Sequence, residues 1–206
     1  MSSRSKRVFF KDYVFSVDEN VYEPAEDSFL FAENLVVAGG ERVLDLGTGS
    51  GILGIIAAEK ACEVVAVDMN PFAVRCAKAN AVVNDARSKM VFIVGDLFKP
   101  FDENVRFDLI LFNAPYLPIV NDTDKSLSAI AWNGGRTGRD LIDRFIGEVF
   151  GYLNLNGRVL LMQSNLAGLD ASVTRFASFG MCVWVLAQCR LPFFETLFLL
   201  EARLAK

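Results

Sequence analysis

The sequence predicts an α/β fold in which a seven-stranded, mostly parallel sheet carries helices on both faces. From residue 41 onward, short aliphatic runs alternate with segments whose apolar residues recur at helical spacing. This alternation is typical of parallel strands joined by crossover helices. Only the stretch LPFF separates the last two strands. Because a parallel crossover needs about a dozen residues, these two strands are expected to pair antiparallel.

The N-terminal elements precede this core. At 206 residues the chain is expected to be one domain, with a lead-in over residues 1–20, an N-terminal helix over 21–40 and the α/β core over 41–206. The stretch VFFKDYVFSV in the lead-in is typical of a short strand pair. Pro24 suits the first helical position, and Val36 continues the apolar face of the helix up to a glycine pair that ends it.

The core elements follow in chain order. Strands are predicted at residues 42–46, 63–68, 90–96, 107–113, 157–163, 181–189 and 195–204. Helices are predicted at residues 51–60, 71–85, 136–153 and 167–178.

Composition excludes several classes of function. A net charge of −4 and a pI near 5.0 give the surface no general attraction for nucleic acid phosphates. No apolar run approaches the roughly 18 to 20 residues that span a bilayer, and charged residues interrupt the N-terminal stretch too early for a signal peptide. A cytoplasmic protein without a membrane span is therefore expected. The chain has no histidine and no C-x-x-C pair, so neither a histidine base nor a metal site is expected.

Four predicted strands end in a polar residue, at what should be one edge of the sheet. Asp45, Asp68, Asp96 and Asn113 each follow a run of aliphatic residues. Sheets of this kind bind ligands outside the carboxyl ends of their strands. Each aspartate taken alone could simply cap a loop. Three aspartates and one asparagine at successive strand ends favour a binding site.

The first strand end reads DLGTGSG, over residues 45–51, and is a candidate ligand loop. Gly47 and Gly49 allow a ligand to approach the main chain closely. The sequence also satisfies G-x-G-x-x-G from Gly49, a spacing typical of dinucleotide sites. Asp45 argues against a dinucleotide, because its carboxylate would repel a pyrophosphate and would suit a cationic ligand.

S-adenosylmethionine fits these requirements, since it carries an ammonium and a sulfonium and has no phosphate. In this interpretation Asp68 accepts hydrogen bonds from the ribose hydroxyls. Asp96 and Leu97, in the stretch GDLF, are placed at the adenine, where the carboxylate reaches the exocyclic amine.

The fourth strand end continues into the tetrapeptide Asn113-Ala114-Pro115-Tyr116. With this tetrapeptide and the features above, the chain resembles the class I S-adenosylmethionine-dependent methyltransferases, whose usual tetrapeptide is (Asn/Asp)-Pro-Pro-(Tyr/Phe). The chain most resembles the HemK-like protein-glutamine N5-methyltransferases, in particular the archaeal and eukaryotic branch that modifies class I release factors. VYEPAEDSF (21–29) and AWNGGRTGRDLIDRF (131–145) match that branch. The resemblance implies a Rossmann-like class I methyltransferase fold and S-adenosyl-L-methionine as cofactor.

The resemblance also implies the acceptor and a partner. The expected acceptor is the glutamine of the Gly-Gly-Gln motif in a class I release factor, and the expected partner is a small zinc-binding activator subunit. Ser28 is expected near the cofactor. Glu26 and Asp27 are expected either to help close the site or only to stabilise a helix N-terminus.

The tetrapeptide suits methyl transfer to an amide. The Asn113 side-chain oxygen and the Ala114 carbonyl are expected to accept both N–H bonds of a substrate amide, which orients a poor nucleophile. Pro115 restricts Ala114 to extended geometry, and Tyr116 is expected to stack on the planar group. Ala114 replaces the usual first proline, so somewhat looser positioning is expected.

Two alternatives remain open on the sequence. A nucleobase amine is also planar, so a DNA or RNA exocyclic-amine (adenine N6) methyltransferase fits the same tetrapeptide, although the acidic pI argues against it. A non-catalytic cofactor-binding subunit is the second alternative, and the intact strand-end acids together with Asn113 argue against that one.

Overall fold

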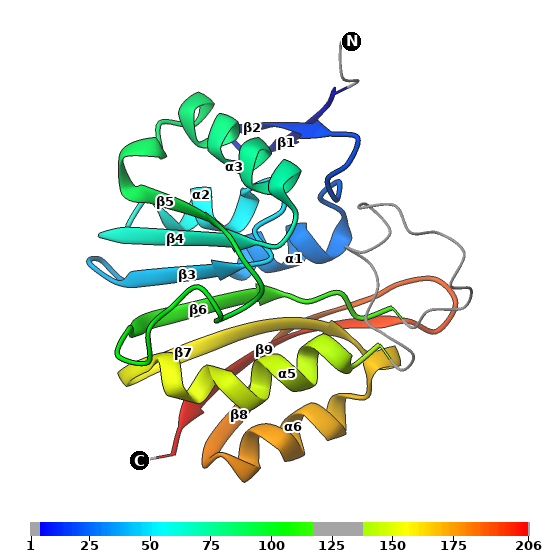
Figure 1. The fold of residues 1–206 in the computed structure, drawn as a ribbon. Helices are drawn as coiled ribbons and strands as arrows, with labels where there is room; N and C mark the ends of the chain where they lie inside the picture. Colours follow the sequence, from blue (N-terminus) through cyan, green and yellow to red (C-terminus); the bar gives the residue numbers. More distant parts are fainter. Residues whose placement is uncertain (1–4, 118–137, 206) are drawn as a thin grey trace.

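The structure is a computed structural model and describes residues 5–117 and 138–205. Its main sheet contains β3 (Arg42–Leu46), β4 (Glu63–Asp68), β5 (Met90–Val94), β6 (Phe107–Asn113), β7 (Leu153–Ser164), β8 (Met181–Arg190) and β9 (Thr196–Leu204). The strand order is β5-β4-β3-β6-β7-β9-β8 (Figure 1). The strands from β5 to β7 pair in parallel, and β9 pairs antiparallel with both β7 and β8. The predicted seven-stranded sheet with one antiparallel strand is confirmed. That strand is the last in the chain, yet it lies inside the sheet and leaves β8 at the edge.

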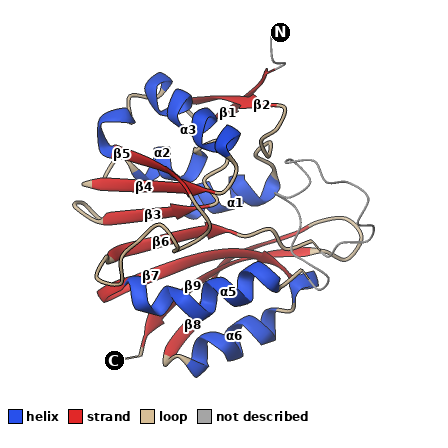
Figure 2. Ribbon diagram, viewed as in Figure 1, coloured by secondary structure: helices blue, strands red, loops and turns tan. Residues whose placement is uncertain are grey.

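Helices cover both faces of the sheet. The helices are α1 (Glu26–Asn34), α2 (Ile52–Ala57), α3 (Pro71–Val83), α5 (Asp140–Val149) and α6 (Leu169–Ser178), with short 3₁₀ turns at Arg87–Lys89, Phe150–Tyr152 and Asn165–Ala167. The chain runs from β3 through β4 to β5 in one direction across the sheet and from β6 to β7 in the other. Right-handed crossovers then put α2 and α3 on one face and α5 on the other (Figure 2). No helix in the described ranges is long and apolar enough to cross a bilayer.

Strand positions matched the prediction better than helix ends. The strands predicted at 42–46, 63–68 and 107–113 are found at those residues. The helix predicted over 21–40 is shorter, because α1 spans only Glu26–Asn34 and Pro24 precedes its N-cap, Ala25. Leu35 is extended, Val36 is 74% exposed and Val37 is buried. This alternation is that of an extended segment, so Val36 is not part of a helical apolar face.

The predicted strand pair in the lead-in is confirmed as the hairpin of β1 (Ser5–Phe10) and β2 (Tyr13–Asp18). Asn80 of α3 and Asn84, the C-cap residue of that helix, bind the second strand of the hairpin. Asn80 and Asn84 accept the backbone N–H groups of Ser16 and Val14 at 2.9 and 3.0 Å. The Asn80 side-chain amide also donates to the Ser50 carbonyl at 2.9 Å. The hairpin is therefore fixed, through α3, to the glycine-rich loop.

Candidate active site

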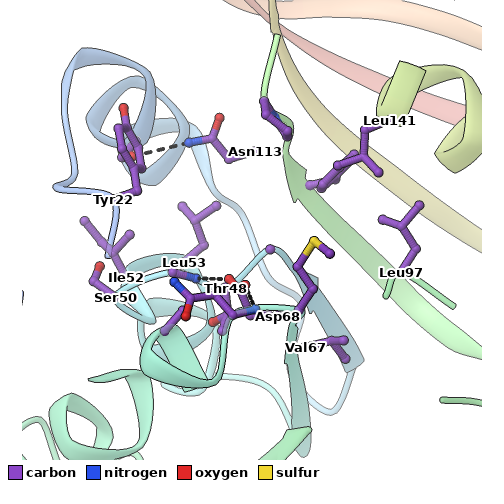
Figure 3. Close-up of a pocket in the computed structure, with 18 of the residues that line it drawn as sticks. Tyr22, Thr48, Ser50, Ile52, Leu53, Val67, Asp68, Leu97, Asn113 and Leu141 are labelled. Carbon is purple, nitrogen blue, oxygen red and sulfur yellow. Dashed lines mark hydrogen bonds between the residues drawn. The ribbon is translucent and has the colours of Figure 1, made fainter. Parts of the chain in front are cut away.

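A cavity opens at the carboxyl edge of the parallel strands. Its walls come from the glycine-rich loop, the ends of β4, β5 and β6, the approach to α1, and the first turn of α5. Figure 3 shows Asp68 and Asn113 on separate parts of this wall, with the side-chain nitrogen of Asn113 directed toward the side where Tyr22 lies. The described cavity therefore joins the two regions that the sequence assigned to cofactor and acceptor.

The glycine-rich loop takes its shape from residues with left-handed backbone. Gly47, Gly49 and Gly51 have φ values of +64°, +55° and +87°, which glycine adopts without steric cost. Gly54 serves close packing instead. A Cβ there would lie 2.8 Å from Asp45 Oδ2 and 2.9 Å from the Met90 Cε atom. The last glycine of the apparent dinucleotide motif thus lets α2 lie close against the sheet.

Asp45 stabilises this loop through two hydrogen bonds. Its Oδ2 atom accepts hydrogen bonds from the Thr48 hydroxyl at 2.6 Å and from the Gly54 backbone N–H at 3.0 Å. The side chain is 1% exposed and is not among the residues that line the cavity. The role expected for Asp45 in cofactor binding stays a prediction, and in this structure its carboxylate faces the glycine-rich loop. Burial raises the pKa of Asp45 to about 7, against the opposing effect of the Thr48 and Gly54 hydrogen bonds.

Asp68 lines the cavity at the end of β4. Its Oδ2 accepts the Gly49 backbone N–H at 3.0 Å, and its Oδ1 accepts the Asn70 backbone N–H at 2.8 Å. These bonds fix the carboxylate and leave one acceptor position on each oxygen. Burial raises the pKa of Asp68.

Asp96 and Leu97 line the cavity just beyond the end of β5. The Asp96 Oδ2 atom forms ion pairs with Lys99 at 2.8 Å and with Arg144 at 2.9 Å. Partial burial raises the pKa of Asp96, but the hydrogen bonds and charges of Lys99 and Arg144 outweigh it, and the net pKa is lowered. Asp96 is therefore a fixed anion that links this wall of the cavity to α5.

The Asn113 side chain is held in one orientation. Its Nδ2 donates to Asp27 Oδ2 at 3.1 Å and to the Ser28 hydroxyl at 3.3 Å. A carboxylate only accepts hydrogen bonds, so the amide nitrogen must face α1 and the amide oxygen must face away from it. That oxygen, Oδ1, is buried and has no hydrogen-bond partner among the described residues. A buried, unpartnered acceptor of this kind is costly unless a ligand satisfies it.

Asp27 is the centre of the network behind Asn113. It is 5% exposed and accepts the Tyr22 hydroxyl at 2.7 Å, the Tyr116 hydroxyl at 3.4 Å and the Ser28 backbone N–H at 2.5 Å. Burial, and then the charge of Asp27, raises the pKa of both tyrosines. Asp27 therefore does more than stabilise a helix N-terminus, and it acts on the site through Asn113.

The tetrapeptide divides between the cavity wall and the core. Asn113 and Pro115 line the cavity. Ala114 and Tyr116 do not, and they are 3% and 7% exposed. The ring of Tyr116 is packed in the core and its hydroxyl points to Asp27, and the stacking role expected for it stays a prediction. The role expected for the Ala114 carbonyl stays a prediction.

Most of the remaining predicted site residues line the cavity, namely Ser28, Gly47, Gly49, Asp68, Asp96 and Leu97. Tyr22 also lines the cavity and was not predicted from the sequence, although it lies inside the stretch VYEPAEDSF. Leu141, which lines the cavity from the first turn of α5, was not predicted either. Residues 131–137 of the second matched stretch lie outside the described residues.

The fold is that of a class I methyltransferase. The model of the ribosomal protein L11 methyltransferase family matches residues 28–136, just over half of the chain. A solved structure of the E. cuniculi Mtq2–Trm112 complex, described as responsible for methylation of the eRF1 translation termination factor, superimposes with a TM-score of 0.70. At 24% identity over 90% of this chain and 99% of that one, it is similar in fold.

Two curated proteins are similar in sequence. A putative protein N5-glutamine methyltransferase of Methanocaldococcus jannaschii is 42% identical over 179 residues, which cover 85% of this chain and 88% of that protein. The methyltransferase HEMK2 of Homo sapiens is 34% identical over 155 residues, or 69% of this chain and 71% of that protein. The chain belongs to the HemK-like protein N5-glutamine methyltransferase family and is a methyltransferase.

Proposed function

We propose that this chain transfers a methyl group from S-adenosyl-L-methionine to the side-chain amide nitrogen of the glutamine in the Gly-Gly-Gln motif of a class I release factor. The observation that carries the proposal is the Asn113 side chain. Asp27 and Ser28 fix its orientation, and its Oδ1 is a buried acceptor without a partner among the described residues. An amide N–H group supplies the hydrogen-bond donor that this oxygen lacks.

The residues of the cavity fit S-adenosyl-L-methionine. Both Asp68 oxygens are fixed by backbone N–H groups and keep acceptor positions for two ribose hydroxyls. Asp96 and Leu97 line the cavity as well, and the adenine next to that ribose would lie against them. The glycine-rich loop lets main chain and ligand approach closely, and the Asp45 charge behind it favours a cation. The bound cofactor would supply an electrophilic methyl group on its sulfonium.

The residues at the acceptor end hold and orient the amide. Asn113 Oδ1 would accept one N–H of the glutamine and the Ala114 carbonyl the other, so that the nitrogen faces the cofactor side of the cavity. Both acceptors stabilise the positive charge that develops on nitrogen as its bond to carbon forms. The proton then leaves after that bond has formed, so no strong base is required, and the chain contains no histidine.

A small zinc-binding activator subunit and a cytoplasmic location belong to the same proposal. The E. cuniculi relative was solved as a complex with Trm112. In this chain β5 is an edge strand of the main sheet, and its Val91 and Val94 are 45% and 55% exposed. Val82 and Val83 of α3 are exposed as well. An open strand edge with apolar side chains is a surface that a partner strand can extend.

The test is methyl transfer from labelled S-adenosyl-L-methionine to a purified class I release factor. The proposal predicts one methyl group per factor, located on the Gly-Gly-Gln glutamine and absent when that glutamine is changed to alanine. The assay is run with and without the activator, since activity of the chain alone would show that no activator is required. Label in DNA or RNA instead would establish the nucleobase alternative and overturn the proposal.

A further inference from the structure

The hairpin that joins β8 to β9 displays two phenylalanines to solvent. Phe193 and Phe194 are 94% and 98% exposed, and both have left-handed backbone, with φ values of +61° and +64°. The Glu195 N–H lies 3.5 Å from the Pro192 carbonyl across the turn. Two consecutive positive φ values define the hairpin turn in which Asn-Gly is strongly preferred. Bulky residues are strained there, so neither burial nor local geometry explains this pair.

The side chain of Asn165 holds the turn in place. Asn165, in the 3₁₀ turn that follows β7, donates from Nδ2 to the Phe194 carbonyl at 3.2 Å and accepts the Thr196 N–H on Oδ1 at 2.7 Å. The Leu191 N–H closes the hairpin on the Glu195 carbonyl at 2.8 Å. Backbone strain that the surrounding structure maintains is concentrated at functional sites.

The hairpin tip lies at the same edge of the sheet as the cavity. Asn113, the last residue of β6, is opposite Met162 of β7. Ser164, two residues further along β7, is opposite Leu197 of β9. The tip, which comes just before β9, therefore projects beyond the carboxyl end of β7. Figure 1 shows it at the end of the sheet where the chain leaves β6. The Glu195 charge is close enough to act on Tyr116, whose pKa is raised by burial, by Asp27 and by Glu195.

We propose that the Phe193–Phe194 tip, with the half-exposed Leu166 beside it, docks into an apolar surface on the protein that carries the methylated glutamine. This inference rests on the proposed function. A protein acceptor must bring its main chain to the rim of the cavity before one glutamine can enter. Two aromatic rings on a turn that Asn165 already holds lose little conformational freedom on binding, and rings of this kind dominate the energy of many interfaces.

The charges around the tip favour a protein over a membrane or a nucleic acid. The turn is flanked by one cation, Arg190, and one anion, Glu195, and the chain carries a net charge of −4. Anionic lipids and nucleic acid phosphates both attract clusters of lysine and arginine. The described hairpin offers no such cluster.

The test is the double variant F193N/F194G in the full chain, with the activator if the wild type requires it. Asn-Gly suits the turn, so the variant is expected to unfold at a temperature at least as high as the wild type. For a class I release factor as acceptor, kcat/KM is expected to fall between tenfold and a hundredfold, mainly through KM. The dissociation constant of S-adenosyl-L-methionine is expected to stay unchanged. The matched control is L155S, which removes an 88% exposed leucine at the opposite end of the sheet and should leave all three quantities unchanged.

Each other outcome overturns the inference. Wild-type kcat/KM in F193N/F194G would show that the tip does not contact the acceptor, and weaker cofactor binding would show that the substitutions disturb the cavity. Loss of binding to phosphatidylcholine–phosphatidylserine vesicles, with methylation intact, would assign the tip to membranes. If the wild type transfers no methyl group to any release factor, the proposed function itself fails, and this is visible before any variant is made.

Discussion

The substitution D45N should remove a pH dependence of stability that Asp45 gives the folded chain. Both hydrogen bonds to Asp45 end on Oδ2, so an asparagine oxygen can keep both while the charge is lost. The pKa of Asp45 rises from 3.8 to about 7 on folding. Between these values the folded state binds the proton that the unfolded state has released, so stability falls as pH rises.

The size of this effect follows from the pKa difference. At about 1.4 kcal/mol per pH unit, the free energy of unfolding of the wild type should fall by about 4 kcal/mol between pH 4 and pH 7 through Asp45 alone, and then level off. D45N should lack this slope, match the wild type near pH 4 and exceed it by about 4 kcal/mol at pH 8.

Urea unfolding of both proteins at half-unit steps from pH 4 to pH 8 measures the difference directly, because other titrating groups cancel between them. Parallel pH profiles would refute this account of Asp45.

The affinity for S-adenosyl-L-methionine tests whether the Asp45 charge also acts on cofactor binding. Affinity for S-adenosyl-L-methionine should rise in the wild type as Asp45 ionises near pH 7, and D45N should show no such rise.

Two further substitutions test the packing around the site. D27N removes the charged acceptor that orients Asn113. Loss of one charged hydrogen bond, about 1.5–3 kcal/mol, should lower kcat about 10- to 150-fold and leave the cofactor dissociation constant unchanged. An equal loss of cofactor binding would contradict a positioning role. G54A puts a Cβ 2.8 Å from Asp45 Oδ2 and should cost about 1–3 kcal/mol in urea unfolding, whereas G39A, with nothing within 4 Å of the new Cβ, should be nearly neutral.

The sequence predicted the sheet and the edge where the site lies, because both depend on local patterns. Buried strands such as Phe107–Asn113 are short aliphatic runs with sharp ends, and the structure has them at the predicted residues. Polar residues at successive strand ends meet by topology alone. Helix ends were predicted less well, since residues 35–37 follow an extended alternation that only the packing of Val37 reveals.

The directions of individual side chains were not predictable in the same way. Asp45 and Tyr116 both occupy expected places along the chain, but one faces the loop and the other faces the core. The role of Asp27 depends on Asn113, 86 residues further along the chain. No local pattern contains such a contact, and only the folded arrangement of α1 against β6 shows it.

The most direct measurement of the central claim is single-turnover methyl transfer by the variant N113A. If Asn113 Oδ1 orients the acceptor amide, the rate with a class I release factor should fall about a hundredfold or more. The dissociation constant of S-adenosyl-L-methionine should stay within about threefold of the wild type, because the Asp68 contacts remain. A wild-type rate of methyl transfer in N113A would contradict the account.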